Sequence, residues 1–220
     1  MIATTAIVMD TVRVSMVEIS KISGRINVTN ACNLSCKYCY VKKSEDVITL
    51  KMCTSFIDKL LQLNNFNNHV TFFGGEPSLC GLIIEKVLEL YIPKGVRFSI
   101  VSNGYFVFDQ RNDYIMNNID NISISLEGCE ASYNVYRGSR GLSDKIEQLC
   151  NLDYNIRHKI NVNMSLNNEL ITNVDEFIVN YIKLSESGIR VHIYSIHGDD
   201  GINSIEDFFK FFIIHKRKML

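Results

Sequence analysis

The chain alternates between two spacings of apolar side chains, and the alternation runs from residue 25 almost to the end. Segments in which every second residue is apolar are typical of strands, whereas apolar residues three and four apart are typical of helices. We expect strands at residues 25–29, 69–73, 97–101, 121–126, 159–166 and 190–195. We expect helices at residues 50–63, 79–91, 109–118, 144–152, 174–184 and 204–217. Six strand–helix units in strict alternation predict an α/β fold with a parallel sheet.

The two faces of the later strands differ in polarity. Ile122, Ile124 and Leu126 share one face of the fourth strand, and the fifth strand repeats this pattern. The opposite faces carry Ser123, Ser125, Glu127, Asn161, Asn163 and Ser165. Because the apolar faces must meet the helices, the polar faces predict a partial (β/α)6, TIM-like barrel with room inside for water, a cofactor or a substrate. An open sheet with one solvated face is the alternative, although parallel sheets are normally covered on both faces.

Length and composition favour one domain without a membrane segment. We expect a variable leader at residues 1–23 and one core domain at residues 24–220. The net charge of −1 gives no field that would attract nucleic acid or an anionic membrane. No stretch approaches the roughly 20 apolar residues of a spanning helix. Seven cysteines without an export signal indicate a reducing compartment, so we expect a cytoplasmic location.

Three of the cysteines lie close together after the first expected strand. Cys32, Cys36 and Cys39 have the spacing C-x3-C-x2-C. Thiolates bind iron–sulfur clusters, and a four-iron cube normally takes four of them. Three thiolates in one loop would leave one iron open to a small molecule that offers an amine and a carboxylate. A zinc knuckle is the alternative, but structural zinc takes four ligands, and no fourth Cys or His lies within the loop.

A second motif, Gly74-Gly75-Glu76-Pro77, ends the second expected strand. The two glycines allow the backbone to approach a ligand closely, and their carbonyl groups can accept from an ammonium group. Glu76 adds a carboxylate at the same place, and Pro77 stiffens the exit from the strand. A plain turn would explain the glycines without any ligand.

Together the two motifs resemble those of the radical S-adenosylmethionine (SAM) superfamily, and the aromatic Tyr40 after the last cysteine fits as well. The resemblance implies a [4Fe–4S] cluster on Cys32, Cys36 and Cys39, with SAM on the open iron and its amino group at the glycine-rich motif. It implies an enzyme that takes one electron from an external reductant such as flavodoxin or ferredoxin. SAM is then cleaved to methionine and a 5′-deoxyadenosyl radical, which takes a hydrogen atom from the substrate.

Further SAM-binding residues follow from this resemblance. Ser102 and Asn103 correspond to a segment that lies beside SAM after the third strand. Ser125 and Glu127 correspond to residues at the end of the fourth strand that accept the ribose hydroxyl groups, where the family usually has aspartate in place of Glu127. A solvated carboxylate at a strand end is the alternative for Glu127.

Three more residues belong to the expected SAM site. Arg137 matches an arginine of the family whose guanidinium group suits the SAM carboxylate. Asn163 and Ser165, on the polar face of the fifth strand, could contact the ribose or the adenine.

The motifs look most like those of the anaerobic sulfatase-maturating and peptide-modifying (SPASM-type) branch, which implies a peptide or protein substrate. Two alternatives stay open, namely an activating enzyme that forms a glycyl radical on a partner, and a catalytically inactive SAM- or metal-binding regulatory protein. Cys53, Cys80, Cys129 and Cys150 are scattered, and we expect them to be structural thiols. Since no cysteine follows Cys150, we expect no C-terminal auxiliary-cluster domain.

Overall fold

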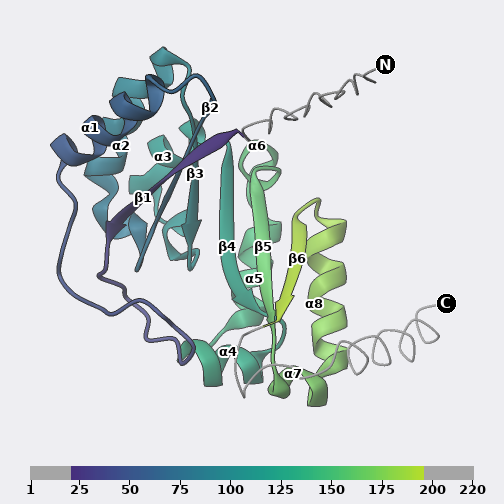
Figure 1. Cartoon of the computed structure of the whole chain (residues 1–220). Helices are drawn as coiled ribbons and strands as arrows, with labels where there is room; N and C mark the ends of the chain where they lie inside the picture. The colour runs from purple at the N-terminus through teal and green to yellow at the C-terminus, as the bar shows by residue number, and fades with distance from the viewer. Residues whose placement is uncertain (1–20, 196–220) are drawn as a thin grey trace, which may run out of the picture.

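A six-stranded parallel sheet forms the centre of the computed structural model, which describes residues 21–195 (Figure 1). The strands are β1 (Ile22–Thr29), β2 (Phe66–Gly74), β3 (Arg97–Ser102), β4 (Asn121–Glu127), β5 (Ile160–Leu166) and β6 (Arg190–Ser195). Their order in the sheet follows the sequence, and each neighbouring pair is parallel. The predicted α/β class is confirmed. Residues 1–20 of the expected leader and the helix expected at 204–217 lie outside the described residues.

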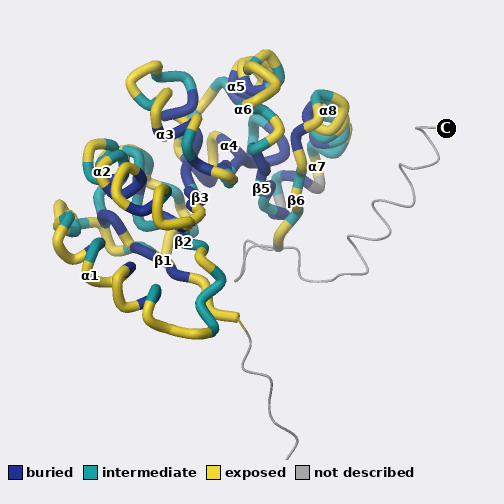
Figure 2. Tube along the Cα trace, turned by 90° about the horizontal axis from the view of Figure 1, so that it is seen from above, coloured by how far each residue is buried: buried dark blue, intermediate teal, exposed yellow. Residues whose placement is uncertain are grey.

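Helices cover the convex side of this sheet. The main ones are α1 (Leu50–Leu61), α2 (Gly81–Tyr91), α3 (Asp113–Asn118), α5 (Leu142–Cys150) and α8 (Val174–Glu186). Short 3-10 helices join some of the elements, namely η1 (Pro77–Cys80), η2 (Ile92–Lys94), η3 (Tyr105–Phe108) and η4 (Gln110–Asn112). Figure 2 shows the strands in an arc with the helices outside it. None of the helices in the described part of the chain is long and apolar enough to cross a membrane.

Three short helices are missing from the sequence-based prediction: α4 (Glu130–Arg137), α6 (Tyr154–Arg157) and α7 (Asn168–Thr172). α4 has few apolar residues, and its helical period is carried mainly by Tyr133 and Tyr136, which are both buried. It ends at Gly138 in the left-handed conformation (φ 63°), a common termination of helices. The two tyrosines and this glycine are the signals by which α4 could have been found.

Polar side chains of three neighbouring strands lie in register on the concave side of the sheet. Ser125 of β4 lies opposite Asn163 of β5, and Glu127 lies opposite Ser165. β6 continues the first of these rows with His192 beside Asn163. The predicted polar inner face is therefore present. Within residues 21–195 the sheet is an open arc, with β1 and β6 at its two edges.

The ends of β1 and β2 approach each other so closely that only glycine fits. A Cβ atom on Gly75 would lie 2.2 Å from the carbonyl oxygen of Ala31, and one on Gly74 would lie 2.2 Å from that of Thr29. The N–H of Gly75 donates to the Thr29 carbonyl (2.7 Å), and that of Glu76 donates to the Ala31 carbonyl (2.8 Å). The glycines thus serve a contact between two strand ends, and their predicted close approach to a ligand stays a prediction.

Replacing Gly75 by alanine should destabilise the fold. The added methyl group would overlap a backbone oxygen that cannot rotate away, so we expect a loss of about 1–3 kcal/mol in unfolding free energy. Gly81→Ala is the matched control, because a Cβ atom there meets its neighbours at 3.6 Å and lies in a helix, where alanine is favoured. Urea unfolding measures the difference, and equal stability of the two variants would contradict the close approach.

Candidate active site

The three-cysteine segment lies in the long loop between β1 and α1. This loop is closed at its base by Thr29, whose hydroxyl group donates to the Asp46 carbonyl (2.8 Å). Cys32 and Cys36 are half-buried and Cys39 is exposed. Figure 1 shows the loop running past the carboxyl ends of the strands toward α4. The cysteines thus lie at the end of the sheet where parallel α/β proteins bind their ligands.

Glu76, directly after β2, is a buried carboxylate surrounded by neutral donors. Its side chain is 1% exposed. Oε1 accepts from the hydroxyl groups of Ser78 (2.7 Å) and Ser102 (2.8 Å), and Oε2 accepts from the N–H of Asn103 (2.8 Å). Because Ser102 ends β3, this carboxylate joins the ends of β2 and β3. Oε2 has a further lone pair with which it can accept from an ammonium group.

Asn103 connects this strand end to the cysteine loop. Its Nδ2 donates to Asn33 Oδ1 at 2.7 Å, and Asn33 immediately follows Cys32. Its Oδ1 accepts from the N–H of Tyr105 (3.2 Å), and its carbonyl accepts from Lys145 Nζ (2.7 Å). Asn103, predicted to lie beside SAM, therefore also holds the start of the cysteine loop against β3.

A buried ion pair occupies the end of β4. Glu127 is fully buried, and its Oε1 accepts from Nε of Arg137 at 3.0 Å. Oε1 also accepts from the Tyr38 hydroxyl group (2.5 Å), and Oε2 accepts from Asn167 Nδ2 (3.1 Å). Arg137 is the last residue of α4, so this short helix delivers the guanidinium group to the carboxylate. The two residues that the sequence assigned separately to the ribose and the carboxylate of SAM thus bind each other.

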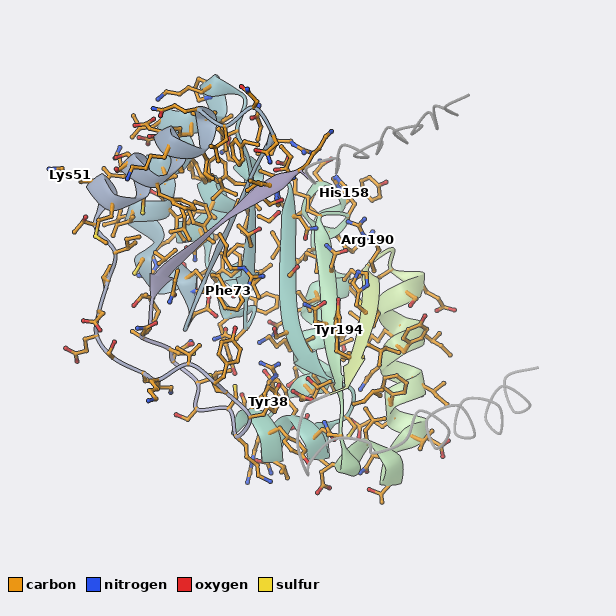
Figure 3. The ribbon with its side chains drawn as sticks, viewed as in Figure 1. Tyr38, Lys51, Phe73, His158, Arg190 and Tyr194 are labelled. Carbon is orange, nitrogen blue, oxygen red and sulfur yellow. The ribbon has the colours of Figure 1, made fainter. Side chains whose placement is uncertain are left out.

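α4 also contacts the cysteine loop directly. The N–H of Lys37 donates to the Tyr136 carbonyl (2.7 Å), and Nη1 of Arg137 lies 3.9 Å from Cys36 Sγ. The ring centroid of Tyr38 lies 5.7 Å from the Arg137 guanidinium group, and Figure 3 shows Tyr38 beside α4 near the end of β4. Sequence reasoning missed Tyr38 as a site residue, although it lies within the cysteine motif itself.

Burial and charge act against each other around Arg137. Burial raises the pKa of the Glu127 carboxyl group, and the Arg137 guanidinium opposes that shift. Burial likewise raises the pKa of the Cys36 thiol, again opposed by Arg137. Since arginine stays protonated in proteins, it favours the charged forms of both neighbours. A fixed positive charge beside a cysteine favours its thiolate form, which is the form that binds metals.

The donors of the cysteine loop fit an iron–sulfur cluster by their chemistry. Cys32 and Cys39 both add to the rise that burial causes in the pKa of the Cys36 thiol. Over residues 21–195, however, no three Cys, His, Asp or Glu side chains are gathered closely enough to hold a metal ion. The assignment therefore rests on residue type and spacing, since a metal can order the ligands of the loop that binds it.

Four other predicted site residues are more exposed than Glu76, Glu127 and Arg137. Tyr40 is 77% exposed, in contrast to the half-buried Tyr38. Ser165 is half-buried on the inner face, with its Oγ 3.5 Å from the Tyr38 hydroxyl group. Ser125 and Asn163 are half-buried in the neighbouring row. Their contacts with SAM stay predictions.

Two further buried polar residues lie near the site, and neither was among the predicted site residues. Asn167, which follows β5, is fully buried and binds Glu127. Lys145 of α5 is 5% exposed, and burial lowers its pKa to about 8, with Arg137 adding to the shift and Glu76 opposing it. Lysine is mostly exposed in proteins, so nothing in the sequence marks this one as buried.

The remaining four cysteines lie outside the three-cysteine loop. Cys53 and Cys129 are buried, and Cys80 and Cys150 are half-buried. Cys129 Sγ lies 3.3 Å from the hydroxyl group of Ser132. These surroundings are those of structural thiols, as the sequence indicated.

Comparison with known proteins gives the family. The model of the radical SAM superfamily matches residues 26–212. The radical SAM cyclopropyl synthase TigE of Paramaledivibacter caminithermalis is 24% identical over 214 residues, which cover 84% of this chain and 45% of that protein. A serine-type anaerobic sulfatase-maturating enzyme of Klebsiella pneumoniae is 28% identical over 176 residues, covering 73% of this chain and 44% of the enzyme. The chain thus spans less than half the length of these curated relatives.

Solved structures share the fold. The structure of anSMEcpe with bound AdoMet and Kp18Cys peptide has a TM-score of 0.68 and 20% identity, covering 86% of this chain and 57% of that chain. Streptococcus suis SuiB bound to S-adenosylmethionine has a TM-score of 0.67 and 15% identity, covering 91% of this chain and 45% of that chain. Since the family model matches nearly the whole sheet together with the cysteine loop, this chain belongs to the radical SAM superfamily of enzymes, whose characteristic cofactors are a [4Fe–4S] cluster and SAM.

Proposed function

We propose that this chain is the core of a radical SAM enzyme that modifies a peptide or protein. A [4Fe–4S] cluster and SAM, when bound, would supply the radical chemistry: with one electron from a reductant of the flavodoxin or ferredoxin type, cleavage of SAM to methionine and a 5′-deoxyadenosyl radical would allow a hydrogen atom to be taken from the substrate. The observation that carries the proposal is the convergence of the cysteine loop, Glu76 and the Glu127–Arg137 pair at the carboxyl ends of the strands.

The chain's own residues would bind and orient the cofactors. Cys32, Cys36 and Cys39 would hold the cluster and leave one iron for SAM. Glu76 Oε2 accepts one protein donor and keeps capacity for the SAM amino group. Arg137 binds Glu127 through Nε alone, so its remaining donors can bind a carboxylate.

Glu127 has the most crowded carboxylate of the proposed site. A carboxylate offers about four lone-pair sites, and four side chains already donate to this one: Tyr38, Arg137, Asn167 and Ser165. We therefore assign Glu127 to orienting Arg137 and Tyr38, and a ribose hydroxyl group would bind this carboxylate by replacing one of its present donors.

A peptide or protein substrate is supported by the relatives and by the inner face of the sheet. Relatives include anaerobic sulfatase-maturating enzymes, and the fold neighbours include anSMEcpe with a bound Kp18Cys peptide and SuiB with the precursor peptide SuiA. Ser125, Asn163 and His192 line the concave side in register, where their side chains can form hydrogen bonds with a polar substrate.

Anaerobic reconstitution with iron and sulfide tests the cluster. We expect about four irons per chain, because three cysteines and SAM complete a four-iron cube. Cys36→Ala should lose the cluster, while Cys150→Ala, which removes a half-buried thiol outside the loop, should keep it. Iron analysis decides the matter, and full iron content in the Cys36→Ala protein would refute the assignment.

The same preparations separate an enzyme from an inactive SAM-binding protein. After addition of SAM and dithionite, the wild-type chain and the Cys150→Ala control should form 5′-deoxyadenosine, and the Cys36→Ala variant should not. Iron-loaded wild-type protein that binds SAM without forming 5′-deoxyadenosine would favour the regulatory alternative.

Removal of Glu127 should reduce both stability and SAM binding. Glu127→Ala leaves the Arg137 charge buried without a counter-charge, which costs about 3–5 kcal/mol in unfolding free energy. Glu127→Gln should cost less, because it keeps an acceptor oxygen. A double-mutant cycle with Arg137→Met should show a coupling of about 0.5–3 kcal/mol. Additive losses would contradict the ion pair, and unchanged SAM affinity in folded Glu127→Ala protein would exclude a role in SAM binding.

A further inference from the structure

The cysteine loop is held from two sides that belong to different parts of the fold. On one side, Asn103 at the end of β3 binds Asn33. On the other side, α4 binds the loop through the Tyr136 carbonyl and through Arg137. These contacts hold the loop at Asn33 and at Lys37, directly after the first and the second cysteine. The β3 turn and α4 must therefore keep a fixed relative position if the thiols are to converge.

One buried side chain contacts both sides. Lys145 Nζ, from α5, donates to the Asn103 carbonyl (2.7 Å) and to the hydroxyl group of Tyr133 (3.2 Å), which lies one turn before Arg137 in α4. The ammonium group also lies 3.8 Å from the ring centroid of Tyr105, which follows the β3 turn. Hydrogen bonds and an aromatic face therefore surround it, as a buried charge requires.

We propose that Lys145 is a positioning residue that fixes the β3 turn and α4 relative to each other, and thereby sets the geometry in which the cysteine loop and Glu76 bind SAM. It touches neither the cysteines nor the carboxylates of Glu76 and Glu127, so it acts through Asn103 and Tyr133. This inference rests on the proposed function for its SAM readout, but the positioning of the loop can be measured without any cofactor.

The charge of Lys145 matters as well as its packing. Arg137 repels its ammonium group, and the buried Glu76 carboxylate attracts it. A hydrogen bond that involves a charged donor is stronger than a neutral one, so the Asn103 carbonyl is held more firmly than a neutral side chain could hold it. A merely space-filling role would be met equally well by methionine, which has a similar length and flexibility.

Hydrogen exchange of the full, cofactor-free chain is the first test. Lys145→Met should raise the exchange rate of residues 31–39 by about tenfold or more, the effect of losing one charge-assisted bond on a local opening equilibrium. Residues 174–186 of α8 should be unaffected. The matched control is Lys159→Met, since Lys159 also donates to a backbone carbonyl (Asn117, 2.8 Å) but at the opposite end of the sheet.

Binding of SAM to the reconstituted protein is the second test. Titration of the reduced cluster with SAM, followed by electron paramagnetic resonance, should give a half-saturation concentration about tenfold or more higher in Lys145→Met than in wild type. Iron content should be normal, and Lys159→Met should match wild type. If Lys145 only stabilised the fold, both lysine variants would change SAM binding alike, or iron content and global stability would fall together.

The outcomes separate the positioning role from the proposed function. Unchanged exchange in residues 31–39 of Lys145→Met overturns the positioning role, whatever the protein binds. Wild-type protein that shows no response to SAM refutes the proposed function but leaves the exchange result valid. If Lys145→Met does not fold, Tyr133→Phe decides the question, because it removes the acceptor of Lys145 on α4, together with the bonds of that hydroxyl group to Tyr105 and Ser139, and should still speed exchange in the loop. Wild-type exchange in Tyr133→Phe would then overturn the proposal.

Discussion

Two carboxylates, Glu76 and Glu127, are buried at the ends of parallel strands, and their need for hydrogen-bond donors constrains how the neighbouring strand ends, α4 and the cysteine loop are arranged. A carboxylate withdrawn from water is tolerated only where donors or a counter-charge surround it. Glu76 meets this requirement with hydroxyl and backbone donors near the end of β3, and Glu127 meets it with Arg137, Tyr38 and Asn167. Since each set of donors comes from a distant part of the chain, satisfying the two carboxylates fixes the relative positions of the strand ends, α4 and the cysteine loop.

The cysteine loop depends on these neighbours because it has little regular structure of its own between β1 and α1. Asn103 holds it at Asn33, while α4 and Glu127 hold it at Lys37 and Tyr38. A loop fixed in this way can offer thiolates at a defined place while the metal completes their geometry. Under the proposed function, stability and cofactor binding would be linked, since the same buried bonds hold the loop proposed to bind the cluster.

Much of the fold could be read from short-range patterns. Apolar periods located the six strands and the main helices, and the polar rows of β4 and β5 indicated an inner face. The apolar pattern missed α4, because this helix of eight residues has few apolar side chains and is marked only by two buried tyrosines and its final glycine. That omission mattered for the site, since α4 carries Arg137 and holds the cysteine loop.

By itself, the sequence determined the α/β alternation, the three-cysteine spacing and the residue types of the site, because these depend on neighbours within a few positions. Only the tertiary structure decided what those residues bind. Glu127 and Tyr38 are 89 positions apart, and Arg137 and Cys36 are 101 apart. The two glycines serve the contact of β1 with β2, which the sequence did not indicate, while their contact with SAM stays a prediction. Such pairings form because folding buries polar groups, and a buried polar group must form hydrogen bonds with residues that the fold brings near it. A local sequence pattern does not show which distant residues those are.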